Sequence, residues 1–172
     1  MKTKQTIVCG FLAVMYALSL GACSGGGQKL TGPTDSFKFM FIDETYTAYV
    51  VNRGTAVEGA VNIPSYYRPD ADSDYQPVTA IGSFYNCSNL TSITIPSTVT
   101  SIRYGAFDGC SSLANITIPA SVTDMGGDVF EGWTASQTIR VKGKANQAEA
   151  DSAWGGGDWR AKCDAKIVYQ GK

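Results

Sequence analysis

Hydrophobic residues in the middle of the chain recur with a 23-residue period. The segment 89–96 (NLTSITIP) recurs at 112–119 (SLANITIP), and the segment 97–102 (STVTSI) recurs at 120–125 (ASVTDM). The same spacing separates Phe84, Phe107 and Phe130, and also Cys87 and Cys110. A fixed period of this length is typical of proteins that are built from stacked repeats.

Each repeat contains a short segment with one apolar face. The end of the pattern LxxIxI alternates apolar and polar residues, which predicts a strand with one buried face. Pro96 and Pro119 end these strands, because proline has no N–H for the ladder. One repeat is too small to bury its apolar residues alone, so the repeats must stack. The predicted core of the stack consists of Phe84, Cys87, Leu90, Ile93, Ile95, Val99, Ile102, Phe107, Cys110, Leu113, Ile116, Ile118, Val122 and Phe130.

The repeat unit LxxIxIPxxVTxIxxxAFxGCxx resembles the BspA-like (type 5) leucine-rich repeat of bacterial surface proteins. Residues 87–119 match this unit closely, whereas 61–86 and 120–142 match it with departures. The repeats therefore predict a mainly β solenoid, a short leucine-rich repeat stack of 23-residue coils over 61–142. The resemblance implies a non-catalytic binding module.

The first repeat carries an insertion between Pro64 and Val78, which contains three aspartates at alternate positions, Asp70, Asp72 and Asp74. A calcium loop of the EF-hand type would need Gly at its sixth position and Glu at its twelfth, where this chain has Tyr and Ile. We therefore favour a solvated acidic loop. The tyrosines around it, Tyr66, Tyr67 and Tyr75, either form a contact site or pack on the first repeat.

Both ends of such a stack need covering, since an open end exposes core residues and strand edges. Alternating residues at 37–43 and 46–51 predict a β-hairpin, and 37–60 form the N-terminal β cap. The C-terminal cap, 143–172, combines a helix over 145–154 with an apolar segment at 167–169. We expect the tryptophans and this segment to cover the last repeat.

The first residues predict export rather than folded structure. Lys2 and Lys4 precede an apolar run at 6–20 that is shorter than the about 20 residues of a membrane span. The run ends in Leu-Gly-Ala-Cys, which resembles a bacterial lipobox, although an ordinary signal peptide that contains a cysteine remains the alternative. The resemblance implies a lipoprotein signal peptide at 1–22, lipid attachment to Cys23 and a flexible tether at 23–36.

Composition and charge exclude several functions. The 172 residues contain no His, which removes Ser-His-Asp and Cys-His catalysis and His-ligated zinc. The formal net charge is −1, so no basic field attracts nucleic acid. The chain has no phosphate-binding glycine loop and no CxxC motif. We expect no enzyme activity, no cofactor and no metal.

The cysteines allow two interpretations. Cys87 and Cys110 occupy equivalent positions in adjacent repeats, about 4.8 Å apart across stacked strands, which is within range of a disulfide. The family resemblance implies instead that both are buried small hydrophobic residues. Cys163 has no evident partner in the sequence.

The outward positions of the predicted strands form the candidate binding face. They are small and polar with one cation, which suits hydrogen bonding to a protein or a glycan. The alternative is that they have no binding role, because Thr and Ser favour solvent-facing strand positions in any case. The face consists of Asn62, Ser92, Thr94, Asn115, Thr117, Thr138 and Arg140.

The prediction is thus a lipid-anchored protein of the bacterial cell envelope, at the outer membrane or the cell surface. It mediates protein binding or adhesion, for example to host matrix or other cells. The alternative is a structural or accessory envelope lipoprotein that associates with itself or with other envelope proteins.

Overall fold

The computed structural model describes residues 28–32, 34–42, 44, 47–55, 57–156 and 158–171. The predicted signal peptide and Cys23 lie outside the described residues. The described part of the chain consists mostly of short strands with connecting turns, and it includes one α-helix, α1 (Gln147–Ala153), and one 3-10 helix, η1 (Asp158–Arg160).

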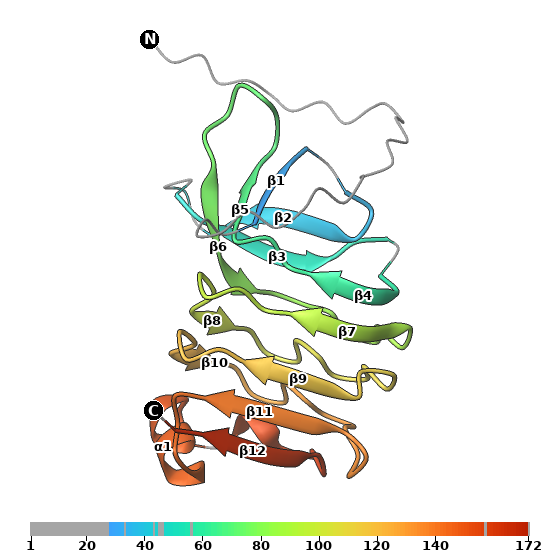
Figure 1. Cartoon of the computed structure of the whole chain (residues 1–172), viewed down its shortest axis with the longest axis vertical. Helices are drawn as coiled ribbons and strands as arrows, with labels where there is room; N and C mark the ends of the chain where they lie inside the picture. Colours follow the sequence, from blue (N-terminus) through green and yellow to red (C-terminus); the bar gives the residue numbers. More distant parts are fainter. Residues whose placement is uncertain are drawn as a thin grey trace.

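Five parallel strands stand one above the other along one side of the molecule (Figure 1). In order along the stack they are β4 (Gly59–Asn62), β7 (Leu90–Thr94), β9 (Asn115–Ile118), β11 (Thr138–Lys142) and β12 (Lys166–Gln170). β4 pairs with β7, and β11 pairs with β9 on one edge and β12 on the other.

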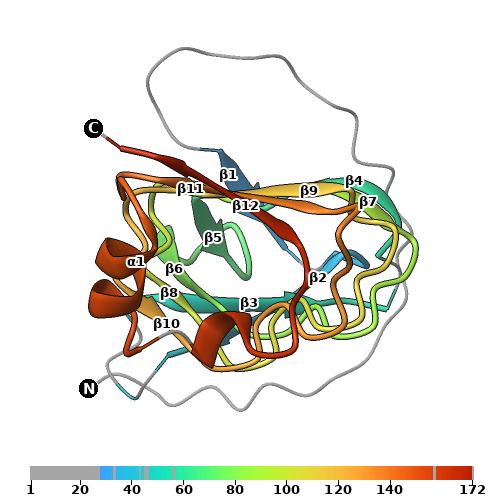
Figure 2. The same cartoon turned by 90° about the horizontal axis from the view of Figure 1, so that it is seen from below.

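The opposite side carries a mixed sheet. β2 (Phe37–Phe41) and β3 (Tyr49–Arg53) form an antiparallel hairpin. β3 then pairs in parallel with β6 (Gln76–Ile81), β6 with β8 (Ser101–Ile102), and β8 with β10 (Asp124–Met125). Figure 2 looks along the stack and shows this second side facing the first across the interior.

The registers of these pairs follow the sequence repeat. Thr117 pairs with Arg140 and Ile102 with Met125, and the partners in each pair lie one repeat period apart in the sequence. Asn62 pairs with Thr94, which lies more than one period further along the chain, because the insertion lengthens the first repeat. Stacking in this register places like residues above like residues.

The interior is one continuous apolar core, and each of the fourteen predicted core residues is buried in it. Three phenylalanines stack through its middle, with ring centroids 5.8 Å apart for Phe84–Phe107 and 5.9 Å for Phe107–Phe130. Phe37 of the hairpin meets Phe84 edge-on, and Trp159 of η1 meets Phe130 in the same way. The aromatic column thus runs from the first hairpin to the C-terminal segment.

Tight corners connect the strands. Gly105 and Gly109 have φ of 59° and 69°, in the left-handed region that favours glycine. Gly126 lies so close to the preceding repeat that an added Cβ would meet the backbone nitrogen of Tyr104. This contact lets adjacent repeats approach closely.

The structure corrects the predicted tether and the N-terminal boundary. Residues 23–36 were expected to stay open, but β1 (Lys29–Thr31) pairs in parallel with β5 (Tyr66–Arg68) of the insertion. The expected boundary between residues 60 and 61 falls inside β4. Strand pairing, which joins residues distant in sequence, accounts for both differences.

The insertion is a hairpin rather than only a loop. β5 pairs antiparallel with the beginning of β6, and the three aspartates lie in the connection between these strands. Figure 1 shows this hairpin at the end of the molecule opposite β12. β6 continues from the hairpin into the repeat, so one strand joins the insertion to the core.

Candidate functional site

The outward residues of the parallel strands form one continuous polar surface, which we call the strand face. Within each of its two sheets, β4–β7 and β9–β11–β12, strand pairing aligns the outward residues in two rows. Asn62, Ser92, Thr94 and Asn115 are exposed, and Thr117, Thr138 and Arg140 are half-buried. The strand face consists of these seven predicted residues together with Lys142, Lys166, Val168 and Gln170 of the last two strands.

β12 supplies a part of this face that the sequence analysis did not assign. Its register with β11 places Lys166 beside Thr138 and Val168 beside Arg140. The segment KIVYQ, with Lys166 and Gln170 at its ends and Ile167 and Tyr169 at the alternate positions, was the signal that could have identified these residues.

The charge on the strand face is entirely positive. β4, β7, β9, β11 and β12 are all fully described, and none contains Asp or Glu. The cations Arg140, Lys142 and Lys166 gather on the last two strands, and neither ion pair found among the described residues involves them. The face is neutral and polar at one end and basic at the other.

Acidic residues lie instead on other parts of the repeats. Asp124, in β10, accepts a hydrogen bond from Ser101 Oγ at 2.7 Å. Asp128 accepts one from Tyr104 Oη at 2.6 Å, which raises the pKa of Tyr104. Acidic side chains therefore occur on the other side of the stack and are absent from the described strands of the strand face.

Cys87 and Cys110 are free thiols, and both are buried. Cys110 Sγ donates to the carbonyl oxygen of Phe84 at 3.2 Å. The neighbouring Cys110 thiol is the main cause that lowers the pKa of Cys87, with a smaller contribution from Arg53. Interaction with Cys87 and burial raise the pKa of Cys110. The structure therefore agrees with the interpretation that both cysteines are buried thiols, and it contains no disulfide between them.

The aspartates of the insertion form a turn. Asp70 accepts hydrogen bonds from the backbone of Asp72 at 3.1 Å and from the backbone and hydroxyl of Ser73 at 2.8 and 2.7 Å. These bonds lower the pKa of Asp70. All three aspartates are exposed, and no group of three or more metal-ligand side chains occurs among the described residues.

A small cleft of about 340 Å³ separates this turn from the first hairpin. Phe41 and Tyr49 line one side of the cleft, while Asp72 and Asp74 line the other. The two rings stack with centroids 4.3 Å apart. Burial raises the pKa of Tyr49 to about 12, so its hydroxyl stays protonated.

The tyrosines of the insertion pack on their surroundings to different degrees. Tyr67 is buried and stacks on Phe39 with centroids 3.9 Å apart. Tyr75 is half-buried and contacts two cations, Lys29 and Arg68, at 4.9 and 4.4 Å from its ring centroid. These contacts link β1 to the insertion.

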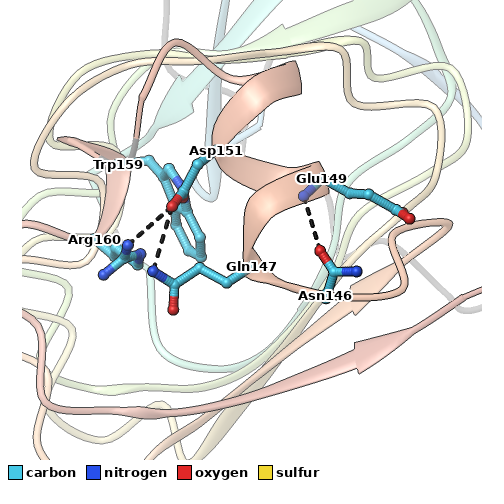
Figure 3. Close-up of polar contacts among 6 residues, drawn as sticks. All are labelled: Asn146, Gln147, Glu149, Asp151, Trp159 and Arg160. Carbon is cyan, nitrogen blue, oxygen red and sulfur yellow. Dashed lines mark hydrogen bonds and ion pairs between the residues drawn. The ribbon is translucent and has the colours of Figure 1, made fainter.

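The C-terminal segment is held by a polar cluster around Asp151 of α1 (Figure 3). Its carboxylate accepts from Arg160 at 3.0 Å and from Trp159 Nε1 at 3.1 Å. The Arg160 bond is the main cause that lowers the pKa of Asp151. At the start of α1, Asn146 Oδ1 accepts from the backbone of Glu149 at 3.0 Å. The cluster seats η1 and its tryptophan at the end of the core.

Comparison with known proteins identifies the repeats. Residues 79–152 match the family model of the BspA type Leucine rich repeat region, with six copies. The fold is thus that of a leucine-rich repeat protein, and residues 79–152 are similar to repeats of the BspA type. The resemblance found in the sequence is confirmed. Leucine-rich repeat domains generally mediate protein interactions and are generally not catalytic.

Two solved structures are similar to this chain. A leucine rich cell surface protein from Faecalibacterium prausnitzii A2-165 is 25% identical, with a TM-score of 0.52 over 69% of this chain and 33% of that one. A leucine rich repeat protein from T. pallidum is 21% identical, with a TM-score of 0.44 over 66% of this chain and 71% of that one. The present chain spans about a third of the first protein. Among curated proteins, none is significantly similar.

Membrane-spanning helices are absent from the part of the chain that the structure describes, where no helix is both long and apolar enough to cross a bilayer.

Proposed function

We propose that this chain is a non-catalytic, lipid-anchored protein of the bacterial cell envelope that binds another protein through the strand face. The observation that carries the proposal is the strand face itself, which combines uncharged hydrogen-bonding side chains with cations and contains no acid. Two adjoining sheets, β4–β7 and β9–β11–β12, hold these side chains over one apolar core. Similarity to a cell surface protein supports a location outside the cytoplasm.

The proposal includes a short solenoid with a cover at each end. The β2–β3 hairpin covers the first repeat through Phe37, and α1 with η1 covers the last through Trp154 and Trp159. Trp154 Nε1 also donates to the carbonyl oxygen of Val122 at 3.0 Å. Side chains of this kind remove apolar ends from water, as a short repeat array requires.

The size of the strand face limits the strength of binding. A standard interface uses roughly 800 Å² on each partner, which would occupy most of one side of so small a stack. We infer that single contacts are weak and that clustering on a membrane supplies avidity. Adhesion to host matrix or to other cells is the form of binding that fits weak, repeated contacts.

Thr94→Glu with Thr117→Glu tests the strand face, because two acidic side chains in its middle would repel an acidic partner. Thr100→Glu with Thr123→Glu makes the same change on exposed residues of the opposite side of the same repeats. Binding of the full-length protein to a panel of purified matrix proteins should fall at least about tenfold in the first pair only. Equal binding by both pairs would contradict the proposal.

Anchoring is tested separately with Cys23→Ala. The wild-type protein should partition into the detergent phase of Triton X-114, and the variant into the aqueous phase. Protease treatment of intact cells then tests location. Degradation of the domain supports a surface role, whereas protection until lysis favours an accessory role inside the envelope.

A further inference from the structure

Among the residues that the structure describes, β12 is the last strand of the parallel column, and one of its edges pairs with no other described strand. Lys166 N donates to the carbonyl oxygen of Gln137 at 2.9 Å, and Gln170 O accepts from Gly143 N at 2.7 Å. Parallel pairing uses alternate residues, so Lys166, Val168 and Gln170 bond to β11. The N–H and C=O groups of Ile167 and Tyr169 point the other way, and no described residue bonds to them.

The side chains of β12 leave room for another strand. Ile167 and Tyr169 face the core side but are only half-buried, unlike Ile139 and Val141, their fully buried neighbours in β11. Figure 2 looks onto this end and shows β12 running across the molecule with α1 to its side. A strand added at the open edge would satisfy the free backbone groups and cover these two side chains.

The charges around the open edge indicate what kind of strand fits. Lys166 is exposed on the outward side of β12, and Arg140 lies beside Val168 one strand further in. Asp164 precedes Lys166 by two residues, yet no ion pair joins them in the described structure. Lys142 adds a third cation on the same side. Outward side chains of an added strand would therefore meet positive charge.

We propose that the open edge of β12 binds an extended segment of a partner protein as an additional strand, with apolar residues facing the core and acidic residues facing Arg140 and Lys166. This inference rests on the proposed protein-binding role and names the partner's chemistry and its mode of attachment. Backbone hydrogen bonds supply affinity in this mode, and the alternating side chains supply selectivity. The occupant is a separate acidic segment, because the basic ends of two copies would repel each other.

The test uses two peptides of equal alternation and opposite charge, acetyl-EVEVEVE-amide and acetyl-KVKVKVK-amide, with the full-length protein in detergent. The acidic peptide should bind at least about tenfold more tightly than the basic one, and binding should weaken in about 0.5 M NaCl. Amide hydrogen exchange at Ile167 and Tyr169 should slow when the acidic peptide binds, because their N–H groups become bonded. Equal binding of both peptides, or binding without this protection, would overturn the proposal.

Variants separate the backbone contribution from the charge contribution. Ile167→Pro removes the N–H group that points toward the open edge, and it leaves the bonds to β11 in place. Ile167→Ala is its control, since both variants lose the isoleucine side chain. The proline should weaken binding at least about tenfold relative to the alanine. Lys166→Gln should weaken binding by up to about fivefold, whereas Lys38→Gln, exposed on the distant β2, should change nothing. The charge variants keep the test decisive if the proline disturbs folding.

The remaining outcomes are also informative. If neither peptide binds and sedimentation shows a dimer that Ile167→Pro abolishes, the edge belongs to a second copy and the proposal is wrong. The Thr94 and Thr117 variants report on the matrix-protein panel alone. A negative peptide experiment therefore does not contradict the proposed function. A negative result with the matrix proteins likewise does not contradict binding at the open edge of β12.

Discussion

Replacing Ile116 by alanine tests whether the repeat register holds the molecule together. Ile116 lies in β9, is 1% exposed and pairs in register with Ile139 of β11. Figure 1 shows β9 between β7 and β11, in the middle of the column. Both neighbouring repeats limit the collapse of the space that a smaller side chain would leave.

The expected cost of this change follows from the lost burial. Alanine lacks three carbon groups of isoleucine, each worth about 0.8 kcal/mol when buried, which gives about 2.4 kcal/mol. The residual cavity adds to this value, so the free energy of unfolding should fall by about 3–4 kcal/mol. Thr117→Ala, on the outward side of the same strand, should cost less than about 1 kcal/mol.

Urea unfolding followed by far-ultraviolet circular dichroism measures both variants. Tryptophan fluorescence provides a second probe at the C-terminal end, where Trp133, Trp154 and Trp159 are buried. Coincident curves from the two probes would license a two-state treatment. An Ile116→Ala protein as stable as Thr117→Ala would refute the assignment of inward and outward positions on which the strand face depends.

Three further substitutions test individual contacts. Gly126→Ala should destabilise by about 1–3 kcal/mol in thermal melts, because its Cβ meets backbone of the preceding repeat, while Gly127→Ala has only ordinary contacts and should be near neutral. Asn146→Ala removes the N-cap of α1 and should lower the free energy of unfolding in urea by about 0.5–2 kcal/mol, with loss of helix signal at lower denaturant. The folded state lowers the pKa of Asp151, so its ionised carboxyl stabilises the fold above its unfolded pKa of about 3.9, and this stability is lost as the pH falls through the folded value. The stability difference between wild type and Asp151→Asn, measured by urea titration at a series of pH values, should therefore be largest near neutrality and shrink below about pH 4; a constant difference would contradict the role of the Arg160 bond.

The candidate site was partly accessible from sequence. Alternation in LxxIxI separates Ile116 from Thr117 without any structure, because side chains on a strand point to opposite faces. The seven face residues follow from that rule and from the period of the repeat. The contribution of Lys166, Val168 and Gln170 did not follow, since it depends on β12 lying beside β11, and α1 and η1 separate these two strands along the chain.

Periodicity by itself determined the repeat architecture of this protein. Equivalent residues in successive repeats meet the same surroundings, so a local pattern of apolar positions specifies both the strands and the core that they share. The family match to residues 79–152 agrees with that interpretation.

Only the tertiary structure decided how the non-repeating segments pair. β1 is three residues long, too short for a pattern, and its partner β5 lies within the insertion. Cys87 and Cys110 satisfy the spacing for a disulfide and for packed thiols alike, and the structure leaves them as thiols. The open edge of β12 likewise depends on which strand comes last in space. Such contacts join segments that are distant along the chain, and their free energy comes from mutual burial and backbone bonds that no local pattern encodes.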